Sequence, residues 1–296
     1  MRIFVTGGTG FFGKSILARR ATAPGRTASD RYTILSRDPD RFRRDNPRFA
    51  DLPGVDWLKG DVRDFAFPEG PFDAIVHAAT SAVTTLSDAE QTSVILEGTR
   101  RVAAFAEACG CRKVLFTSSG AVYGPQTAPV AEDAPCRPAT AYGKAKLAAE
   151  RLLLDAGLDV RIARCFAFTG PHLNRDIHYA VGNFIRDALA GRPVVVRGDG
   201  TPRRSYLFAD DLVDWLFAIL ACGETGRPYN VGSDVSVSVR ELAETVARVL
   251  GGGPVQILGR PTDAPPAVYV PVVERARREL GLSVAVPLEE AIRKSV

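Results

Sequence analysis

Long apolar stretches are missing from this sequence. No run of about 18 consecutive apolar residues occurs, which is the length that a helix needs to cross a bilayer. The first residues lead directly into a strand-like segment instead of the basic and apolar regions of a secretory signal peptide. From these two features we expect a cytoplasmic protein with no membrane partner.

Cysteine is scarce, with five residues in a chain of 296, and no Cys-x-x-Cys pair is present. Cys109 and Cys111 are close in sequence, but no second group of ligands accompanies them. Structural zinc sites commonly use such groups, and disulfide frameworks use many more cysteines for a chain of this length. We therefore expect reduced thiols and no metal site.

A strong charge imbalance is also lacking, because 38 Lys and Arg residues stand against 34 Asp and Glu residues. A local concentration of arginine at residues 37–48 matches no nucleic-acid-binding module, so we expect no nucleic-acid partner. The composition, 46% hydrophobic and 24% charged, is that of an ordinary globular protein. The length suits one large α/β domain, or such a domain with a smaller partner.

A glycine-dense turn follows the first strand-like segment. The apolar run Ile3–Val5 is typical of a strand that is buried on both faces, and a helical pattern begins after the turn. Gly7, Gly10 and Gly13 follow one another at intervals of three residues. Glycines at this spacing allow a sharp turn, a close approach of the backbone to a pyrophosphate, and close packing of helix and sheet. The helix then directs its free N–H groups at the phosphates. The turn predicts a dinucleotide site that includes Gly7, Gly10, Phe11, Phe12 and Gly13.

The second expected strand, residues 32–35, ends in Ser36 and Arg37. An acidic residue at this point usually binds the ribose hydroxyls of NAD, whereas an arginine can pair with the 2′-phosphate of NADP. Arg37 therefore favours NADP, and the neighbouring Asp38 keeps NAD possible. The alternatives are that Arg37 stacks on the adenine or points to solvent.

Strands and helices alternate through the next part of the chain. We expect strands at 55–58, 74–76 and 113–116 and a helix at about 88–109, an order that implies a doubly wound parallel sheet. The fourth strand ends in His77, which we interpret as a packed histidine. The small residues after it, Ala78, Ala79 and Thr80, would let the backbone come close to a flat cofactor.

Tyr142 and Lys146 are four residues apart in a helix expected from about Thr140 to Gly157, so they share one face. A nearby ammonium, assisted by a cationic nicotinamide, stabilises a phenolate and lowers its pKa. The hydroxyl-rich segment 117–124, which contains Ser119, follows the fifth strand at the sheet edge where ligands bind. Together these features predict acid–base chemistry beside a dinucleotide.

With these motifs the sequence resembles the extended short-chain dehydrogenase/reductase family, the nucleotide-sugar epimerases, dehydratases and reductases. The resemblance runs the whole length and includes GGTGFFG, GDVRD, SSGAVYG, YGKAK, ARCFAFTGP, GNFIRDALAGRPVVVRGDGTPRRSYLFADDLV, YNVGS, RPTDAP and ELGL. It implies a Rossmann-type α/β fold, a nucleotide-diphosphate sugar as substrate, an NAD or NADP cofactor, and a homodimer.

The resemblance also assigns roles to individual residues. Tyr142 looks like the catalytic acid–base, Lys146 like its electrostatic partner, and Ser119 like the hydroxyl that binds the reacting sugar oxygen. On the same basis, Asp61 and Val62 would touch adenine and Phe166 would lie near the nicotinamide. The sugar nucleotide would be held by Asn183 and Arg204, with Arg260 on its diphosphate.

The sequence departs from the family pattern at several positions. The 4,6-dehydratases usually carry Asp-Glu after the catalytic hydroxyl residue, and here Gly120 and Ala121 stand there, which disfavours dehydration. Ile95 and Ala167 replace Asn residues that are frequent in the family, so the sugar pocket should differ in its details.

We therefore expect a doubly wound domain over 1–170, with 207–233 returning to it through a helix at about 210–220. Residues 171–206 and 234–296 should form a smaller C-terminal substrate-binding lobe. The favoured activity is the reduction of a 4-keto-6-deoxyhexose carried on a nucleotide, with NADP favoured and NAD possible. The alternatives are an NAD-retaining 4-epimerase and, from another class, a non-catalytic dinucleotide-binding regulator.

Overall fold

A parallel sheet of seven strands forms the centre of the molecule. The computed structural model describes residues 1–22, 30–80, 86–177, 179–260 and 263–296. The strand order is β11-β6-β5-β4-β1-β2-β3, and every neighbouring pair is parallel. The strands are β1 (Arg2–Thr6), β2 (Arg31–Ser36), β3 (Val55–Lys59), β4 (Ala74–His77), β5 (Lys113–Ser119), β6 (Asp159–Cys165) and β11 (Pro228–Val231). This confirms the doubly wound α/β fold.

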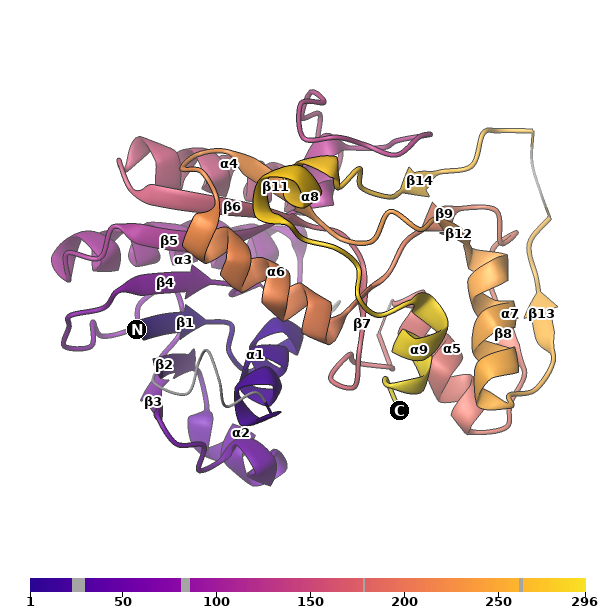
Figure 1. Cartoon of the computed structure of the whole chain (residues 1–296), viewed down its shortest axis with the longest axis horizontal. Helices are drawn as coiled ribbons and strands as arrows, with labels where there is room; N and C mark the ends of the chain where they lie inside the picture. The colour runs from indigo at the N-terminus through magenta and orange to yellow at the C-terminus, as the bar shows by residue number, and fades with distance from the viewer. Residues whose placement is uncertain (23–29, 81–85, 178, 261–262) are drawn as a thin grey trace.

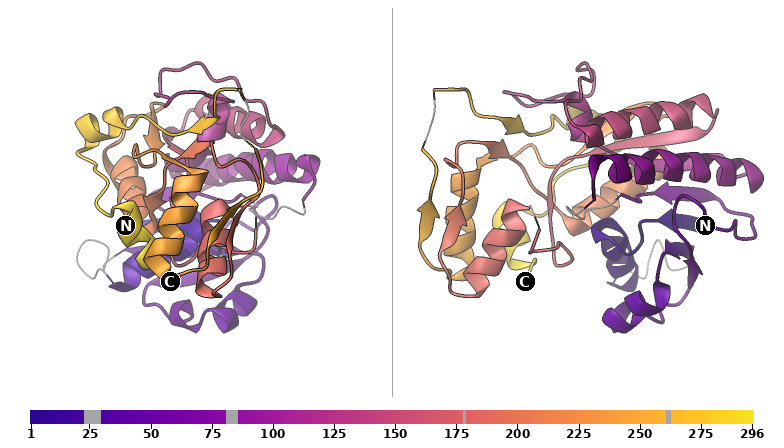
Figure 2. Two further views of the ribbon diagram at one scale, coloured as in Figure 1. Left: turned by 90° about the vertical axis from the view of Figure 1, so that its right-hand side faces the viewer. Right: turned by 180° about the vertical axis from the view of Figure 1, so that it is seen from behind.

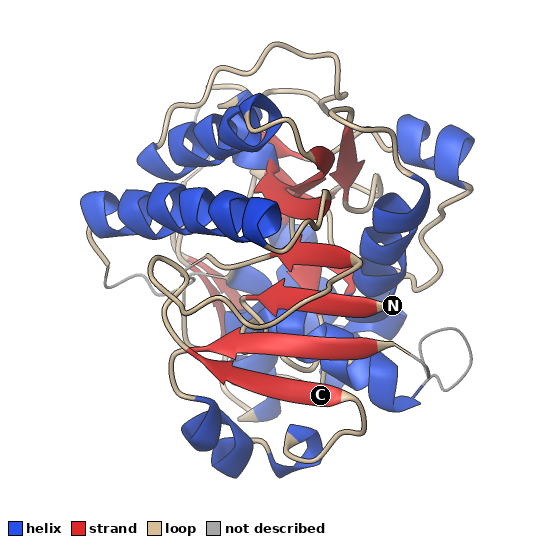
Figure 3. Ribbon diagram, turned by 90° about the vertical axis from the view of Figure 1, so that its left-hand side faces the viewer, coloured by secondary structure: helices blue, strands red, loops and turns tan. Residues whose placement is uncertain are grey.

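Helices cover both faces of this sheet (Figures 1 and 3). One face carries α1 (Phe11–Thr22) and α6 (Ala209–Cys222), and the other carries α3 (Asp88–Ala108) and α4 (Ala141–Asp155). Side chains alternate along β1. Ile3 and Val5 pack into the core under α1 and α6, whereas Phe4 packs into the core under α3 and α4. Beyond β2 the chain forms α2 (Pro39–Asp45) and a short 3-10 helix, Pro47–Phe49.

A second, smaller body with its own core lies beside the carboxyl edge of the sheet (Figure 2). It contains α5 (Ala180–Leu189), α7 (Val239–Leu250) and the paired strands β8 (Val194–Val196) and β13 (Val255–Ile257). A short sheet joins β12 (Val237–Ser238), β9 (Arg203–Arg204) and β14 (Val268–Tyr269). The helix α9 (Leu288–Arg293) adds to this body, whereas the paired strands β7 (Phe168–Thr169) and β10 (Leu207–Phe208) place Phe168 and Leu207 in the core of the main sheet.

The C-terminal part of the chain serves both bodies. The helix α8 (Glu274–Leu280) packs on the core of the main sheet through Ala276, whereas Ile292 of α9 belongs to the core of the smaller body. The helix expected at 210–220 is α6, and its buried residues join the core under the main sheet. The exact division into domain and lobe stays a proposal. Within the described ranges, no helix combines the length and the apolar character needed to cross a membrane.

Candidate active site

The fifth strand ends three residues later than the sequence predicts, and its extension carries Ser119 to the sheet edge. The strand continues because Thr117–Ser119 pair with Ala163–Cys165 of β6, a partner that a local pattern does not reveal. A short 3-10 helix, Gly120–Tyr123, begins directly after it. The Ser119 hydroxyl oxygen accepts a hydrogen bond from Ala121 N at 3.1 Å, which holds this side chain at the start of the turn.

The helix α4 presents Tyr142 and Lys146 to the same edge. Thr140 caps the helix by accepting a hydrogen bond from Gly143 N at 3.1 Å. Lys146 is almost completely buried, and its Nζ donates to the main-chain oxygen of Thr117 at 2.8 Å and to Thr80 Oγ1 at 2.6 Å. Its Nζ lies 5.9 Å from the centre of the Tyr142 ring. The structure thus brings α4, β5 and the segment that follows β4 together at one ammonium group.

Burial dominates the electrostatics of these two groups. It lowers the pKa of Lys146 to about 8, and the proximity of Cys165 and Glu150 opposes this shift. Burial also raises the pKa of the Tyr142 phenol above its usual value, and the Ser119 hydroxyl opposes this shift. The expected lowering of the Tyr142 pKa is therefore not seen in the protein alone, because burial disfavours the charged phenolate. At neutral pH, Tyr142 in the free protein holds its proton.

The glycine turn forms a close-fitting cradle. Gly7 has a φ of +74°, and a Cβ atom there would lie 2.5 Å from Ala78 O. A Cβ atom at Gly13 would lie 2.2 Å from the backbone of Gly8, so only glycine allows α1 to start here. The Ala79 N–H is held by Thr6 Oγ1 at 3.1 Å. Such bare backbone at a helix start fits the pyrophosphate of a dinucleotide.

The aromatic pair after the turn has a packing role as well. Phe11 and Phe12 are the first residues of α1, so their N–H groups are free of helical partners. Their rings pack near Phe168, with centres 6.4 and 5.2 Å away. This anchors the start of the helix between the sheet and the loop that follows β6.

The ribose end of the expected cofactor site is basic and exposed. Arg37 follows β2 and is exposed, while the Asp38 carboxylate accepts a hydrogen bond from Arg41 N at 3.0 Å as the cap of α2. The Asp61 carboxylate pairs with Arg63 at 2.8 Å, and this pair, with a smaller effect from Arg37, lowers the pKa of Asp61. Arg37 and Asp61 are therefore near one another, as an adenosine site requires.

Val62, the other residue expected at adenine, is buried against Gly98, where a Cβ atom would lie 2.9 Å from Val62 Cγ1. Ile95, which replaces a frequent Asn, is buried in the same core and offers no side chain to a sugar. Its main-chain oxygen accepts a hydrogen bond from Thr99 Oγ1 at 2.6 Å. Ala167, the other replacement, packs at the border of the smaller core.

The three residues expected to hold the sugar nucleotide differ in their burial and in their hydrogen bonds. Arg204 lies on β9, half-buried, and donates from Nη1 to Arg203 O at 2.9 Å. Asn183 is half-buried on α5, and Arg260 is exposed just after β13. In the described part of the chain, neither Asn183 nor Arg260 forms a hydrogen bond or ion pair with Ser119, Tyr142 or Lys146. Their roles stay predictions.

Tyr269 is a site residue that sequence reasoning missed. It lies on β14 directly opposite Arg204 of β9, and its hydroxyl is 3.4 Å from the Ser119 hydroxyl. Its ring packs against the ring of Phe166, with centres 4.8 Å apart. Phe166, which we expect near the nicotinamide, therefore also contacts Tyr269. No motif marks this tyrosine, because the strand pairing that places it is formed only in the folded chain.

A buried polar network lies behind the site. Arg164 of β6 forms an ion pair with Glu150 of α4 at 2.8 Å and donates to Tyr123 OH at 3.1 Å. Ser118, which points away from its neighbour Ser119, donates to Glu150. The network ties β5, β6 and α4 together, and sequence spacing gave no signal for it.

His77 is a packed histidine, as the sequence indicates. Its ring nitrogens lie 2.8 Å from Thr6 Oγ1 and 3.0 Å from Thr99 Oγ1, and burial lowers its pKa to about 3. Both nitrogens are used within the core, so His77 is unavailable as an acid–base group.

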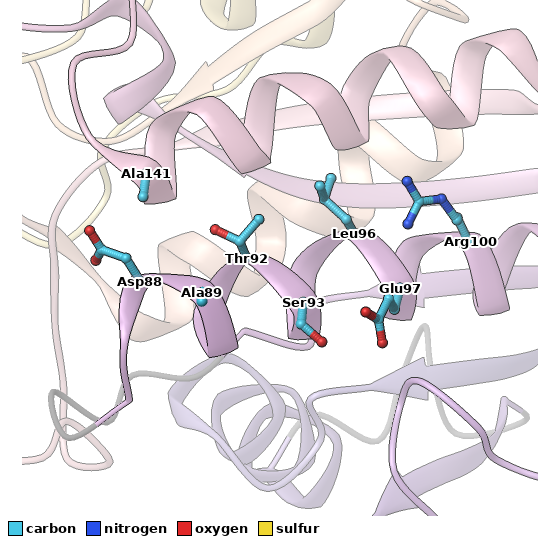
Figure 4. A pocket seen from close by; sticks show the side chains of 8 residues that line it. All are labelled: Asp88, Ala89, Thr92, Ser93, Leu96, Glu97, Arg100 and Ala141. Atoms are coloured by element: carbon cyan, nitrogen blue, oxygen red, sulfur yellow. The ribbon is translucent and has the colours of Figure 1, made fainter.

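A hollow of about 440 Å³ lies along α3 and beside the start of α4 (Figure 4). It is lined by Asp88, Ala89, Thr92, Ser93, Leu96, Glu97, Arg100 and Ala141. None of the predicted catalytic residues lines it, although Ala141 directly precedes Tyr142 in the chain.

Curated relatives match nearly the whole chain. UDP-glucuronic acid decarboxylase 6 of Arabidopsis thaliana is 31% identical over 313 residues, which cover 99% of this chain and 87% of that protein. UDP-glucose 4-epimerase of Mycolicibacterium smegmatis is 32% identical over 271 residues, which cover 85% of this chain and 83% of the relative.

Solved structures share the fold. DesIV, a dTDP-glucose 4,6-dehydratase from Streptomyces venezuelae solved with NAD, has a TM-score of 0.83 at 26% identity and covers 100% of this chain and 96% of its own. A UDP-glucuronic acid 4-epimerase from Bacillus cereus, solved with UDP-glucuronic acid and NAD, has a TM-score of 0.85 at 19% identity, with 100% and 98% covered. The model of the NAD dependent epimerase/dehydratase family matches residues 3–232. Because this match covers most of the chain, the chain belongs to the NAD dependent epimerase/dehydratase family.

Proposed function

We propose that this protein is an oxidoreductase that reduces the 4-keto group of a nucleotide-diphosphate 6-deoxyhexose. The observation that carries the proposal is the pairing of a protonated phenol, Tyr142, with the Ser119 hydroxyl at an edge that lacks the two carboxyls of a dehydratase. Gly120 and Ala121 stand at those positions, and a Cβ atom at Gly120 would lie 2.7 Å from the Phe166 ring. The site therefore has no room for a carboxylate at residue 120.

The chain has residues suited to a nicotinamide dinucleotide. The turn at Gly7, Gly10 and Gly13 would receive its pyrophosphate, and Lys146 and Phe166 would lie at its nicotinamide end. When bound, such a cofactor supplies hydride transfer, which the side chains of a protein do not perform. The remaining task, control of a proton at the reacting oxygen, belongs to residues of this chain.

Tyr142 is suited to donate that proton. Burial raises the pKa of its phenol, so the group is protonated at neutral pH in the free protein. Reduction of a ketone creates an alkoxide, and a phenol placed at the oxygen can protonate it as the charge develops. Ser119 would hydrogen-bond the same oxygen, and the Lys146 ammonium would stabilise the phenolate that remains.

The cofactor of this reaction would be NADPH. Asp38, the candidate partner for a ribose diol, is engaged as the cap of α2, whereas Arg37 is exposed beside Asp61. An exposed guanidinium can form a bidentate pair with a 2′-phosphate. Solved members of the fold carry NAD, so the preference rests on these residues alone.

The second candidate is a 4-epimerase that keeps its NAD. A relative at 32% identity is a UDP-glucose 4-epimerase, and a site with one phenol and one hydroxyl could serve both directions of hydride transfer. Relatives named UDP-glucuronic acid decarboxylase make decarboxylation a further outcome to be tested.

The nucleotide content of the purified protein and three assays separate these candidates. Oxidation of added NADPH with a dTDP- or UDP-linked 4-keto-6-deoxyhexose would support the proposal. Release of bound NAD on denaturation, with conversion of UDP-glucose to UDP-galactose without added cofactor, would replace it by the epimerase. Release of carbon dioxide from UDP-glucuronic acid would replace it by the decarboxylase. Light scattering would test the homodimer that we also propose from the family resemblance.

A further inference from the structure

Two oxygen atoms hold the Lys146 ammonium in the candidate active site. Its Nζ donates to the main-chain oxygen of Thr117 at 2.8 Å and to the side-chain oxygen of Thr80, Oγ1, at 2.6 Å. Lys146 is only 2% exposed, and the centre of the Phe116 ring lies 4.9 Å from Nζ. Within the described ranges, the ammonium forms no other hydrogen bond. The Thr80 side chain therefore makes one of the two hydrogen bonds that this buried charge forms there.

The direction of the bond to Thr80 follows from the chemistry of the two groups. An ammonium has three donor hydrogens and no acceptor, so Thr80 Oγ1 can only accept. Thr117 O occupies a second hydrogen and leaves one for the reaction. Thr80 follows β4 and Thr117 belongs to β5, which are neighbouring strands of the sheet. The two bonds therefore fix the ammonium to the sheet at two points.

We propose that Thr80 is a positioning residue whose hydroxyl oxygen holds the Lys146 side chain in its charged form at the site. This inference rests on the proposed function, in which the Lys146 ammonium stabilises the phenolate of Tyr142 after proton transfer. The sequence marks Thr80 only as a small residue beside the expected cofactor. The hydrogen bond gives its side chain a task that the preceding Ala78 and Ala79 could not perform.

Burial makes the loss of such a bond measurable. Removal from water lowers the pKa of Lys146 to about 8, so only a small margin keeps this group charged at neutral pH. A hydrogen bond to the charged form opposes the effect of burial on the pKa. One bond to a charged group can move a pKa by about one to two units. Without the Thr80 oxygen, we therefore expect Lys146 to lose its proton at a pH lower by that amount.

Two titratable groups of α4 lie near Lys146. The Glu150 carboxylate forms an ion pair with Arg164 at 2.8 Å, so its charge is compensated. Burial raises the pKa of the Tyr142 phenol above its usual value, so this group keeps its proton at neutral pH in the free protein.

The strands beside Lys146 carry two further titratable groups. Burial lowers the pKa of His77 on β4 to about 3. Burial also raises the pKa of the Cys165 thiol on β6 to about 12. Both groups are neutral around neutral pH, so an effect of pH on the free site in this range can be assigned to Lys146.

The test is the pH–rate profile of Thr80→Val in the full chain. Valine has the shape of threonine and lacks the hydroxyl, so packing is kept and the acceptor is lost. The midpoint at which kcat falls with rising pH, about 8 in the wild type, should move down by about one to two units. Below the new midpoint, kcat should return to within about threefold of the wild-type value, because the ammonium is charged again.

Binding of NADH gives a second measurement that needs no turnover. We expect Lys146 to contact the cofactor, so the affinity for NADH should fall as the ammonium loses its proton. NADH is the chosen probe because it lacks the 2′-phosphate of NADPH, which itself titrates near about pH 6. Fluorescence titration should place the midpoint of this fall about one to two units lower in Thr80→Val than in the wild type.

Two further variants control the experiment. Thr80→Ser restores the oxygen and should bring both midpoints back to within about half a unit of the wild-type values. Thr245→Val is the matched control, since it removes a hydroxyl that donates to Glu241 O within α7, in the smaller body. It should leave both midpoints unchanged. Thermal melting across the same pH range would confirm that all variants are folded.

Three results would overturn the inference. Wild-type midpoints in Thr80→Val would show that the hydroxyl does not hold the charge of Lys146. A loss of equal size at every pH would show a purely structural role. A shift that Thr80→Ser does not reverse would show that the oxygen is not its cause.

The two measurements keep this inference separate from the proposed function. Epimerisation or decarboxylation in place of reduction would end the proposed function, and the pH profile of that reaction would still decide the role of Thr80. If the protein turned over no nucleotide sugar at all, the NADH titration would decide it alone.

Discussion

The Lys146 ammonium donates a hydrogen bond of 2.8 Å to the main-chain oxygen of Thr117, two residues before Ser119. This bond fixes the helix that carries Tyr142 to the strand that carries Ser119. A single buried cation thereby sets both the geometry and the charge of the site.

Replacing Tyr142 by Phe should remove the proton donor and leave the cofactor site intact. General acid–base groups contribute about 10²- to 10⁴-fold, so turnover should fall by that amount. Steady-state kinetics and the binding of NADPH, followed by its fluorescence, would be measured together. Turnover within about threefold of the wild type would rule out this role.

The activity should decline as the pH rises through about 8, the pKa to which burial lowers Lys146. Below this pH the ammonium is charged and stabilises a phenolate, and above it the charge is lost. A pH–rate profile would show the decline, and Lys146→Ala should lower both the rate and cofactor affinity. Lys144→Ala is the control, since Lys144 is exposed on the same helix. A flat profile up to the ordinary range of a lysine would contradict the expectation.

Arg204→Ala should weaken binding of the sugar nucleotide without changing cofactor affinity. Loss of a charge-assisted contact with phosphate costs about 1.5–3 kcal/mol. Calorimetry with UDP would measure it, with the exposed Arg197→Ala as the control for lost charge. An unchanged dissociation constant would mean that the phosphates bind elsewhere.

Arg37→Asp should abolish or reverse a preference for NADPH over NADH. One charge-assisted pair with the 2′-phosphate supports a preference of about tenfold or more, and a carboxylate there would repel the phosphate. Titration with both cofactors tests this, with Arg44→Asp on the exposed face of α2 as the control. Equal affinities in the wild type, unaltered by Arg37→Asp, would remove the ground for choosing NADPH.

Removing one partner of the buried pair between Arg164 and Glu150 should destabilise the protein strongly. Arg164→Met leaves the Glu150 carboxylate buried without its partner, which costs about 3–5 kcal/mol. Replacing both residues, as Glu150→Leu with Arg164→Met, should recover much of the loss. Urea unfolding would measure both variants, and a double variant less stable than Arg164→Met would contradict this account.

Features that depend on neighbours a few residues away could be predicted from the amino-acid sequence. The glycines at positions 7, 10 and 13 indicate a tight turn between strand and helix, and the four-residue spacing of Tyr142 and Lys146 indicates that they share one helical face. The alternation of strand-like and helical segments was enough to predict the parallel sheet. Each of these is a local property, since helix periodicity and turn conformation are set within one or two turns of chain.

Which groups far apart in the sequence come into contact depends on the folded chain. Tyr269 and Ser119 are 150 residues apart, and their hydroxyls approach because β14 pairs with β9 beside the main sheet. The pKa directions of Tyr142 and Lys146 likewise follow from burial, which depends on the packing of α4 against β5 and on neighbours from other elements. The sequence shows which side chains can be charged, but the desolvation of a side chain depends on all the groups that pack around that side chain in the folded protein.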